Sequence, residues 1–276
     1  MSGELLQRSD APFGREVWKQ IDNAVCEAAR NQLSARRVLE TEGPYGLSLT
    51  SLPLGERFLE RESDENVRIT ANRSVPVPLI SSTFTLAARD IDNFVRKGLP
   101  MNLGPAARAA VQCARKEDRL LFYGSEALGM GGLLTAQGVG AVSLKEWKQP
   151  GDGVQDVLKA INKIDDAGFH GPYVLALEPS RYTALLRRYP QGSTLEIEHM
   201  REVIGGEVVK APAIDGGGVL VAQGRHLASI VLGQDLMIAF EGPEGREYTF
   251  VVSESPALRL TEPAAVCCLQ ISGRTA

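Results

Sequence analysis

The sequence has few residues of the types and spacings that support nucleophilic or metal chemistry. Its three histidines, His170, His199 and His226, stand apart, and none occurs in an H-x-x-x-H or H-E-x-x-H pattern. No two of the four cysteines have C-x-x-C spacing, and the adjacent Cys267 and Cys268 cannot easily bridge to each other or share a metal ion. We therefore expect no metal site and reduced cysteines, with a disulfide to a partner through Cys267 or Cys268 as the alternative.

Serines and paired carboxylates give no clearer sign of catalysis. No G-x-S-x-G motif is present, and no motif pairs another serine with a base. The pairs Asp90/Asp92 and Asp165/Asp166 have the chemistry of a general acid and base, but helix capping and solvated helix faces account for such pairs far more often. The sequence therefore predicts a structural protein and not an enzyme.

A glycine-rich stretch lies between residues 124 and 140. Loops that bind phosphates use glycine, but the segment Gly129-Met130-Gly131-Gly132 contains neither G-x-G-x-x-G nor G-K-[ST]. We therefore expect a backbone turn between two parts of the fold here, and no nucleotide site. The charged run over residues 115–119 is expected to be a solvated helix face.

The composition excludes several classes of partner. The chain has 30 Lys+Arg against 34 Asp+Glu, and its net charge of −4 argues against nucleic-acid binding. With 43% hydrophobic and 23% charged residues, the 276-residue chain can bury a core, in one large domain or two interleaved ones. No apolar run approaches the ~20 residues of a membrane span, and none resembles a signal peptide. We expect a cytoplasmic protein that binds neither nucleic acid nor membranes.

Periodic apolar positions predict two principal helices. From Phe13 to Leu33 the apolar residues recur every three or four positions, which predicts a helix with one apolar stripe. Gly14 is suited to cap this helix, and Phe13 and Trp18 would then form a hydrophobic staple. A second helix is expected over 105–122, with a proline in its first turn. Shorter helical patterns occur at 87–96, 154–167, 180–188 and 194–204.

Extended segments make up the rest of the pattern. Residues 47–80 contain two strand-like runs, which predict a long two-stranded ribbon. Such a ribbon is only marginally stable alone, so we expect it to lie on another surface, which is a first indication of assembly. Further strands are expected at 83–86, 173–177, 219–222, 227–232, 236–240, 248–252 and 264–269. Because strands and helices mix without βαβ alternation, the expected fold class is α+β.

Taken in order, these segments resemble the encapsulin shell proteins, also known as linocin or bacteriocin-like proteins. The resemblance runs from about residue 11 to residue 266. Each motif is weak alone, but their order and spacing across the chain are specific. The motifs are Ala11-Pro12, Trp18-Lys19-Gln20-Ile21-Asp22, Arg36-Arg37, Glu42-Gly43-Pro44-Tyr45-Gly46, Ser63-Asp64-Glu65-Asn66, Thr83-Phe84-Thr85-Leu86, Asp92-Asn93, Gly171-Pro172-Tyr173 and Leu232-Gly233-Gln234-Asp235-Leu236.

That family implies the HK97-type fold of tailed-phage capsid proteins, which combines a peripheral domain, an axial domain and an extended loop. Part of the C-terminal strands is assignable to either domain. The implied boundaries are 1–46 for the N-terminal helix and arm, 47–78 for the extended loop, 79–132 and 221–266 for the peripheral domain with its spine helix, 133–220 for the axial domain, and 267–276 for a tail.

The resemblance also implies a shell subunit that is not itself catalytic. About 60 copies, arranged as a T=1 icosahedron, form the smallest closed shell of this kind. Inside lies a cargo enzyme, a ferritin-like protein or a dye-decolourising peroxidase, which is held by a short targeting peptide and links the shell to iron storage or oxidative stress.

Two other functions are alternatives. A secreted bacteriocin or protease would need a nucleophile motif and a signal peptide, and the sequence shows neither. A phage major capsid protein would need a scaffolding region or pro-segment, for which a helix beginning near residue 14 leaves no room. A neighbouring peroxidase or ferritin-like gene would favour the shell, and a portal gene the phage capsid.

The resemblance places the cargo peptide in a groove between the N-terminal helix and strands of the peripheral domain. Strand alternation would put the apolar residues between 230 and 240 on one face, and Glu40 or Asp235 would pair with a peptide cation. The alternative is that the apolar side chains are plain core, holding helix to sheet. The residues assigned to the groove are Val17, Ile21, Val25, Arg36, Glu40, Ile230, Leu232, Asp235, Leu236, Ile238 and Phe240.

The resemblance places a pore at the five-fold axis, lined by a loop between two axial-domain helices. Five copies of an arginine would form a positive ring there, unless Glu196 or Glu198 offsets it. The alternative is that both arginines of the loop point back into helix contacts. The loop consists of Arg187, Arg188, Tyr189, Pro190, Gln191, Gly192 and Ser193.

Some relatives carry a tryptophan after the Thr-Phe-Thr-Leu motif, on which a flavin can stack. This chain has Arg89 at that place. No cofactor is therefore expected.

Overall fold

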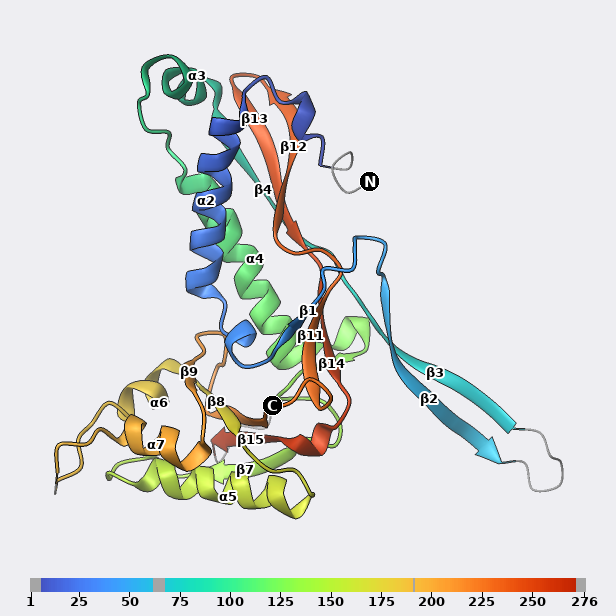
Figure 1. Ribbon diagram of the computed structural model, residues 1–276, viewed down its shortest axis with the longest axis vertical. Helices are drawn as coiled ribbons and strands as arrows, with labels where there is room; N and C mark the ends of the chain where they lie inside the picture. Colours follow the sequence, from blue (N-terminus) through green and yellow to red (C-terminus); the bar gives the residue numbers. More distant parts are fainter. Residues whose placement is uncertain (1–5, 62–67, 191, 272–276) are drawn as a thin grey trace.

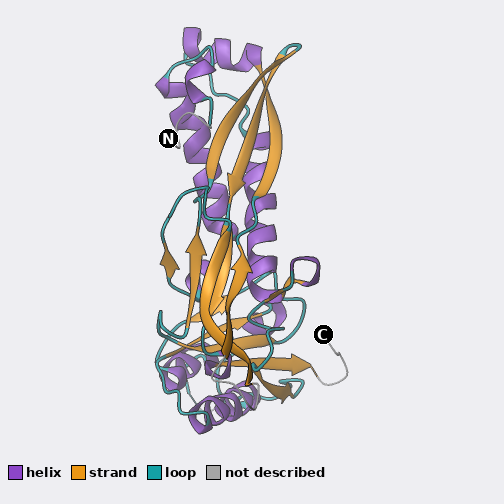
Figure 2. Ribbon diagram, turned by 90° about the vertical axis from the view of Figure 1, so that its right-hand side faces the viewer, coloured by secondary structure: helices purple, strands orange, loops and turns teal. Residues whose placement is uncertain are grey.

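The computed structural model describes residues 6–61, 68–190 and 192–271, of which 56–61 and 68–71 are described by their backbone only. The molecule is elongated, and three sheets follow one another along its long axis (Figure 2). A two-stranded arm projects from its side (Figure 1).

The upper part of the molecule packs two helices on one antiparallel sheet. The sheet has the order β12 (Met237–Glu244), β13 (Glu247–Glu254) and β4 (Ile80–Ala87). The long helix α4 (Gly104–Tyr123) and the N-terminal helix α2 (Arg15–Gln32) lie side by side against it, and α3 (Ala88–Lys97) follows β4 (Figure 1). The predicted helices over 13–33 and 105–122 are thereby confirmed.

The start of α2 has the predicted cap and staple. Gly14 is its N-cap, and the rings of Phe13 and Trp18 lie 5.5 Å apart between centroids. Phe13 also contacts Phe240 and Phe250 of the sheet. The staple therefore joins the beginning of the helix to the core of this part of the molecule.

A short central sheet connects the two ends of the molecule. It has the order β1 (Thr41–Glu42), β11 (Ala228–Leu232) and β14 (Pro256–Leu260). The expectation that residues 230–240 share one strand face is wrong, because β11 and β12 belong to different sheets. Hydrogen bonds between residues 233–234 and Ser255 hold the connection in place, and they turn the chain out of β11.

The lower part contains a five-stranded sheet of order β7-β15-β10-β8-β9, where β8 and β10 are buried along their whole length. One face packs on the helices α5 and α7, and the other packs on the central sheet and the end of α4. The elements are β7 (Gly140–Leu144), α5 (Asp152–Asp166), β8 (Tyr173–Leu177), α6 (Pro179–Ala184), α7 (Glu196–Ile204), β9 (Val208–Lys210), β10 (Gly218–Ala222) and β15 (Val266–Ile271).

The expectation of a tail beginning at residue 267 is wrong for residues 267–271. They form most of β15, which lies between β7 and β10. Cys267 and Cys268 are 0% and 2% exposed and carry free thiols. The two cysteines therefore act as small apolar residues in a strand that is covered on both faces.

The arm consists of β2 (Ser51–Arg61) and β3 (Arg68–Pro76), paired antiparallel as the sequence predicts. At its base, Leu52 and Val77 are buried against Val231 and Ala257 of the central sheet. Beyond the base the ribbon extends away from the rest of the chain (Figure 1).

The glycine-rich stretch forms tight turns, as expected. It contains β5 (Gly124–Ser125), η3 (Glu126–Leu128) and β6 (Met130–Gly131). Gly124 has φ +72°, and a Cβ there would lie 2.1 Å from the carbonyl oxygen of Met130. Only glycine permits this close approach of two backbone segments.

Candidate docking and pore sites

The apolar residues assigned to the cargo groove fall into two separate cores. Val17, Ile21 and Val25 of α2 pack with Ile238 and Phe240 of β12, and all five are at most 4% exposed. In the chain by itself, these side chains hold the helix to the sheet.

Two further apolar residues of the set, Ile230 and Leu232 of β11, lie in a different core, with Ala35 and Leu121. They too are almost fully buried, at 0% and 2% exposed. The structure therefore does not bring the apolar side chains of the set together in one open groove.

The polar members of the set, and Leu236, lie nearer to solvent. Leu236 is half-buried and packs against the upper core. Asp235 and Glu40 are exposed, and Glu40 lies 3.9 Å from Arg225. A pocket of about 270 Å³ opens beside Glu40, lined by residues 36–41 with 222–224 and Ala228.

Arg36 connects its own turn to α4, to β13 and to the segment before β12. It lies in the short turn η2 (Ala35–Arg37), and its Nε and Nη2 donate to the two carboxylate oxygens of Glu117 at 2.7 Å. Nη2 also donates to Glu254 at 3.0 Å, and Nη1 donates to Asp235 at 2.7 Å. Burial would lower the pKa of Arg36, but these three carboxylates raise it above its usual value.

Glu254 is fully buried beside this guanidinium. Its burial and the negative charge of Glu117 raise the pKa of Glu254 to about 10, although Arg36 acts in the opposite direction. Burial and Glu117 therefore favour the protonated form of Glu254.

The expectation of a solvated charged face over 115–119 is wrong for two residues. Glu117 and Asp118 are both fully buried. The Asp118 carboxylate accepts hydrogen bonds from the backbone N–H groups of Ser34 and Ala35 and from the Ser34 hydroxyl, at 2.6 to 3.1 Å. The two carboxylates fix the chain where it leaves α2, and the local sequence of α4 gives no sign of this role.

The expected pore loop lies between α6 and α7, and its two arginines differ. Arg187 donates to the carbonyls of Trp147 and Lys148 at 3.0 and 3.2 Å, and lies 3.3 Å from the fully buried Glu196. Arg187 thus points back into the domain, as in the alternative reading. Arg188 is exposed, and its backbone forms an antiparallel β-bridge with Leu195. The helix α6 therefore ends at Ala184, before the predicted residue 188.

The tip of this loop is open to solvent. Pro190, Gly192 and Ser193 are exposed, whereas Gln191 lies outside the described residues. Tyr189 is half-buried, and its hydroxyl lies 2.8 Å from Nδ1 of His199 on α7. Contacts of Arg187 and Tyr189 therefore hold the loop to the domain. Arg188, Pro190, Gly192 and Ser193 are exposed to solvent.

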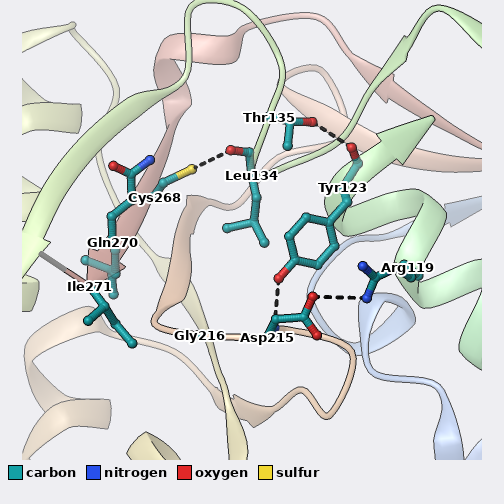
Figure 3. A pocket seen from close by; sticks show the side chains of 10 residues that line it. Arg119, Tyr123, Leu134, Thr135, Asp215, Gly216, Cys268, Gln270 and Ile271 are labelled. Atoms are coloured by element: carbon teal, nitrogen blue, oxygen red, sulfur yellow. Dashed lines mark hydrogen bonds and ion pairs between the residues drawn. The ribbon is translucent and has the colours of Figure 1, made fainter. Parts of the chain in front are cut away.

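A pocket of about 750 Å³ lies where the end of α4 meets β15 (Figure 3). The Tyr123 hydroxyl accepts from the backbone N–H of Asp215 at 2.7 Å, and Arg119 pairs with the Asp215 carboxylate at 3.1 Å. We assign no ligand to this pocket.

Within the described residues, no group of three His, Cys, Asp or Glu is placed to hold a metal ion. Over the same residues, no helix combines the length and the apolarity needed to cross a membrane.

Comparison with known proteins matches these features to one family. The family model described as "Encapsulating protein for peroxidase" matches residues 3–257. The type 1 encapsulin shell protein of Myxococcus xanthus is 32% identical, over 99% of this chain and 98% of that protein. A diheme-cytochrome–encapsulin shell fusion protein of Kuenenia stuttgartiensis is 31% identical, over 95% of this chain and 75% of that protein.

Solved structures share the fold. A virus-like particle from Pyrococcus furiosus superposes with a TM-score of 0.74 at 21% identity, covering 92% of this chain and all of that one. The capsid of the Myoviridae phage XM1 gives a TM-score of 0.58 at 16% identity, covering 85% of this chain and 89% of that one. The expected α+β, HK97-type fold is thereby confirmed. By sequence and by fold, the chain belongs to the encapsulin family of shell-forming nanocompartment proteins.

Proposed function

We propose that about 60 copies of this chain assemble into a closed T=1 icosahedral shell. The observation that carries this proposal is the β2–β3 arm, whose strands pair with each other and leave both outer edges without a sheet partner from the described chain. A two-stranded ribbon gains stability when a neighbouring chain covers it. Heterologous contacts of this kind close into a shell when the rotation between copies permits it.

Exposed apolar side chains near the base of the arm support the same assembly. Tyr45 is 58% exposed and Leu79 is 55% exposed. They flank the base of the arm, where the Val77 N–H donates to the Thr50 carbonyl and the Tyr45 N–H donates to the Leu232 carbonyl. These two apolar side chains are available for contact with another copy of the chain.

We propose that the shell encloses a redox enzyme and is not itself catalytic. The family description names a peroxidase, and one relative is fused to a diheme cytochrome. For this chain the cargo would be a dye-decolourising peroxidase or a ferritin-like protein, so the compartment would serve the response to oxidative stress or iron storage inside the cell.

The cargo's targeting peptide would dock along the seam between α2 and β12. The buried apolar residues of this seam form the platform. The accessible groups of the assigned set are Leu236 and Asp235, just before β12, and Glu40, just before β1 of the central sheet. Glu40 is the group best placed to pair with a peptide cation, because its contact with Arg225, at 3.9 Å, is looser than the contact of Asp235 with Arg36, at 2.7 Å. The loop over 187–193 would line the pore, with Arg188 as its accessible cation.

Removal of the arm tests the assembly. A variant in which a short Gly-Ser linker replaces residues 56–68 should elute as monomers or small oligomers, whereas the intact chain should elute as megadalton particles. Thermal unfolding of both proteins provides the control that the shortened chain still folds. Megadalton particles from the shortened chain would show that the arm is not the assembly element.

A further inference from the structure

The helix α3 has an apolar stripe that the core covers only in part. Ile91 is 4% exposed, and the half-buried Phe94 packs with it against the upper core. Val95 follows on the same side of the helix, four positions after Ile91, and is 60% exposed. Leu99, just past the Gly98 that ends the helix, is 49% exposed. The end of α3 therefore presents two large apolar side chains to water.

Positive charge accompanies these apolar side chains. Arg96 and Lys97 form the last turn of α3, both are exposed, and residues 98–107 contain no charged residue. Arg96 pairs with Asp92 at 2.6 Å, but the two side chains are 74% and 57% exposed, so solvent screens this pair. Lys97 makes no ion pair with a described residue. We call residues 95–99 the basic end of α3.

The turn between β12 and β13 carries an excess of negative charge. Glu241, Glu244 and Glu247 are exposed, and Arg246 is the one cation in this turn. Glu244 and Glu247 stand directly opposite each other in the strand register, where like charges destabilise a hairpin. The Thr249 hydroxyl donates to Glu244 at 3.2 Å, but no side-chain cation of the described chain pairs with these three carboxylates. A cation from outside the chain would relieve the repulsion.

The acidic turn and the basic end of α3 lie at the same end of the molecule (Figure 1). The Ala88 N–H donates to the Arg246 carbonyl at 3.0 Å, so the turn lies beside the beginning of α3. The basic residues are at the other end of this 10-residue helix, about 15 Å away along its axis. A surface that carries both members of a complementary pair, held apart, can be covered by the same surface of a second copy.

We propose that the upper ends of neighbouring copies dock on each other, with the basic end of α3 in one copy against the acidic turn of the next. Val95 and Leu99 are covered in this contact, and Lys97 faces the pair Glu244 and Glu247. A second copy fits better than a polyanion or an anionic membrane, because the acidic turn repels both of those. The inference rests on the proposed function, since it assigns a contact, separate from the arm, that helps to close the shell.

Exchange of the two charges tests this contact in the full-length chain. Lys97→Glu and Glu244→Lys should each raise, by about tenfold, the chain concentration at which half of the material elutes as particles, because each variant places like charges at the contact. The double variant restores opposite charges and should return this concentration to within about threefold of the original. Loss of a cation from the last turn of α3 weakens the helix equally in Lys97→Glu and in the double variant, so recovery reports the contact and not folding.

Lys116→Glu is the matched control, because it makes the same substitution at an exposed position of α4, outside both charged groups. It should assemble as the unmodified chain does. Single variants that assemble normally, a double variant no better than the single ones, or an equal defect in Lys116→Glu would each overturn the contact. If electron microscopy shows no particles of the unmodified chain, the proposed function fails. Sedimentation velocity of the same proteins then tests the contact in small oligomers, where the same loss and recovery are expected.

Discussion

Glu254 and Glu117 place two buried carboxyl groups on the same nitrogen of Arg36. The Nη2 atom lies 3.0 Å from the Glu254 carboxyl and 2.7 Å from that of Glu117. A single guanidinium does not neutralise both groups at this depth, so the pair retains one proton. The joint between η2, α4 and β13 therefore depends on a protonated glutamate.

A pH dependence follows from this proton. The folded chain raises the pKa of Glu254 to about 10 from a usual value of 4.5, so between these two values the folded state binds more protons than the unfolded state. Stability from this group is complete below pH 4.5 and falls as the pH rises towards 10, by at most about 1.4 kcal/mol per pH unit. Glu254→Gln should remove that slope and leave the chain more stable than the original at pH 9.

Thermal unfolding measured from pH 6 to pH 10 checks this expectation. Glu247→Gln is the matched control, because it makes the same side-chain substitution at an exposed position of the same strand. Parallel curves for the Glu254 variant and the unmodified chain would contradict the shared proton.

Arg36 itself should be far less replaceable than its neighbour in sequence. Arg36→Ala leaves the fully buried Glu117 without its cation, a change that typically destabilises a protein by about 3–5 kcal/mol. The exposed Arg37 makes one hydrogen bond, to the carbonyl of Lys210, and Arg37→Ala should change stability by less than about 1 kcal/mol. Soluble yield and the midpoint of unfolding distinguish the two. Similar midpoints for both variants would show that Glu117 finds another partner.

Local sequence patterns were sufficient to predict the helices of the upper part of the molecule. The period of the apolar residues and the cap at Gly14 both depend on neighbours within a few positions, and both are found in α2. The arm was predictable for the same reason, since its two strands are close in sequence and pair with each other.

Features that depend on distant partners could not be read in this way. Glu117 looks solvated within its own helix, and its burial depends on Arg36, 81 positions earlier. The break between β11 and β12 depends on Ser255, which is some 20 residues away from Gly233 and Gln234. For the candidate sites, the family resemblance and the residue types predicted which residues belong to the set. Only the packing of the folded chain shows that the apolar platform is buried whereas Leu236, Asp235 and Glu40 are accessible.

The division between platform and accessible residues predicts two different outcomes for the cargo seam. Ile21 is fully buried in the upper core, so Ile21→Asp should prevent folding and yield no particles. Leu236 is half-buried, so Leu236→Asp should allow particles to form but reduce their content of co-expressed cargo. Particle yield by size exclusion and cargo content by gel densitometry give the two readouts. Fully loaded particles of the Leu236 variant would remove this residue from the docking surface.

The two arginines of the pore loop should also give different outcomes. Arg188 is exposed, so Arg188→Glu should leave particles intact and slow the entry of small anions, because the ring of positive charge proposed at the pore would become negative. Arg187→Ala should act on stability, since it leaves the fully buried Glu196 without its cation and frees the carbonyls of Trp147 and Lys148. Iodide quenching of a fluorescent protein enclosed in the shell measures anion entry, and thermal unfolding measures stability. The control is Arg201→Glu, which changes the charge by the same amount at an exposed position of α7 outside the loop. If it slows iodide as much as Arg188→Glu does, the effect belongs to the overall charge of the particle and not to this loop.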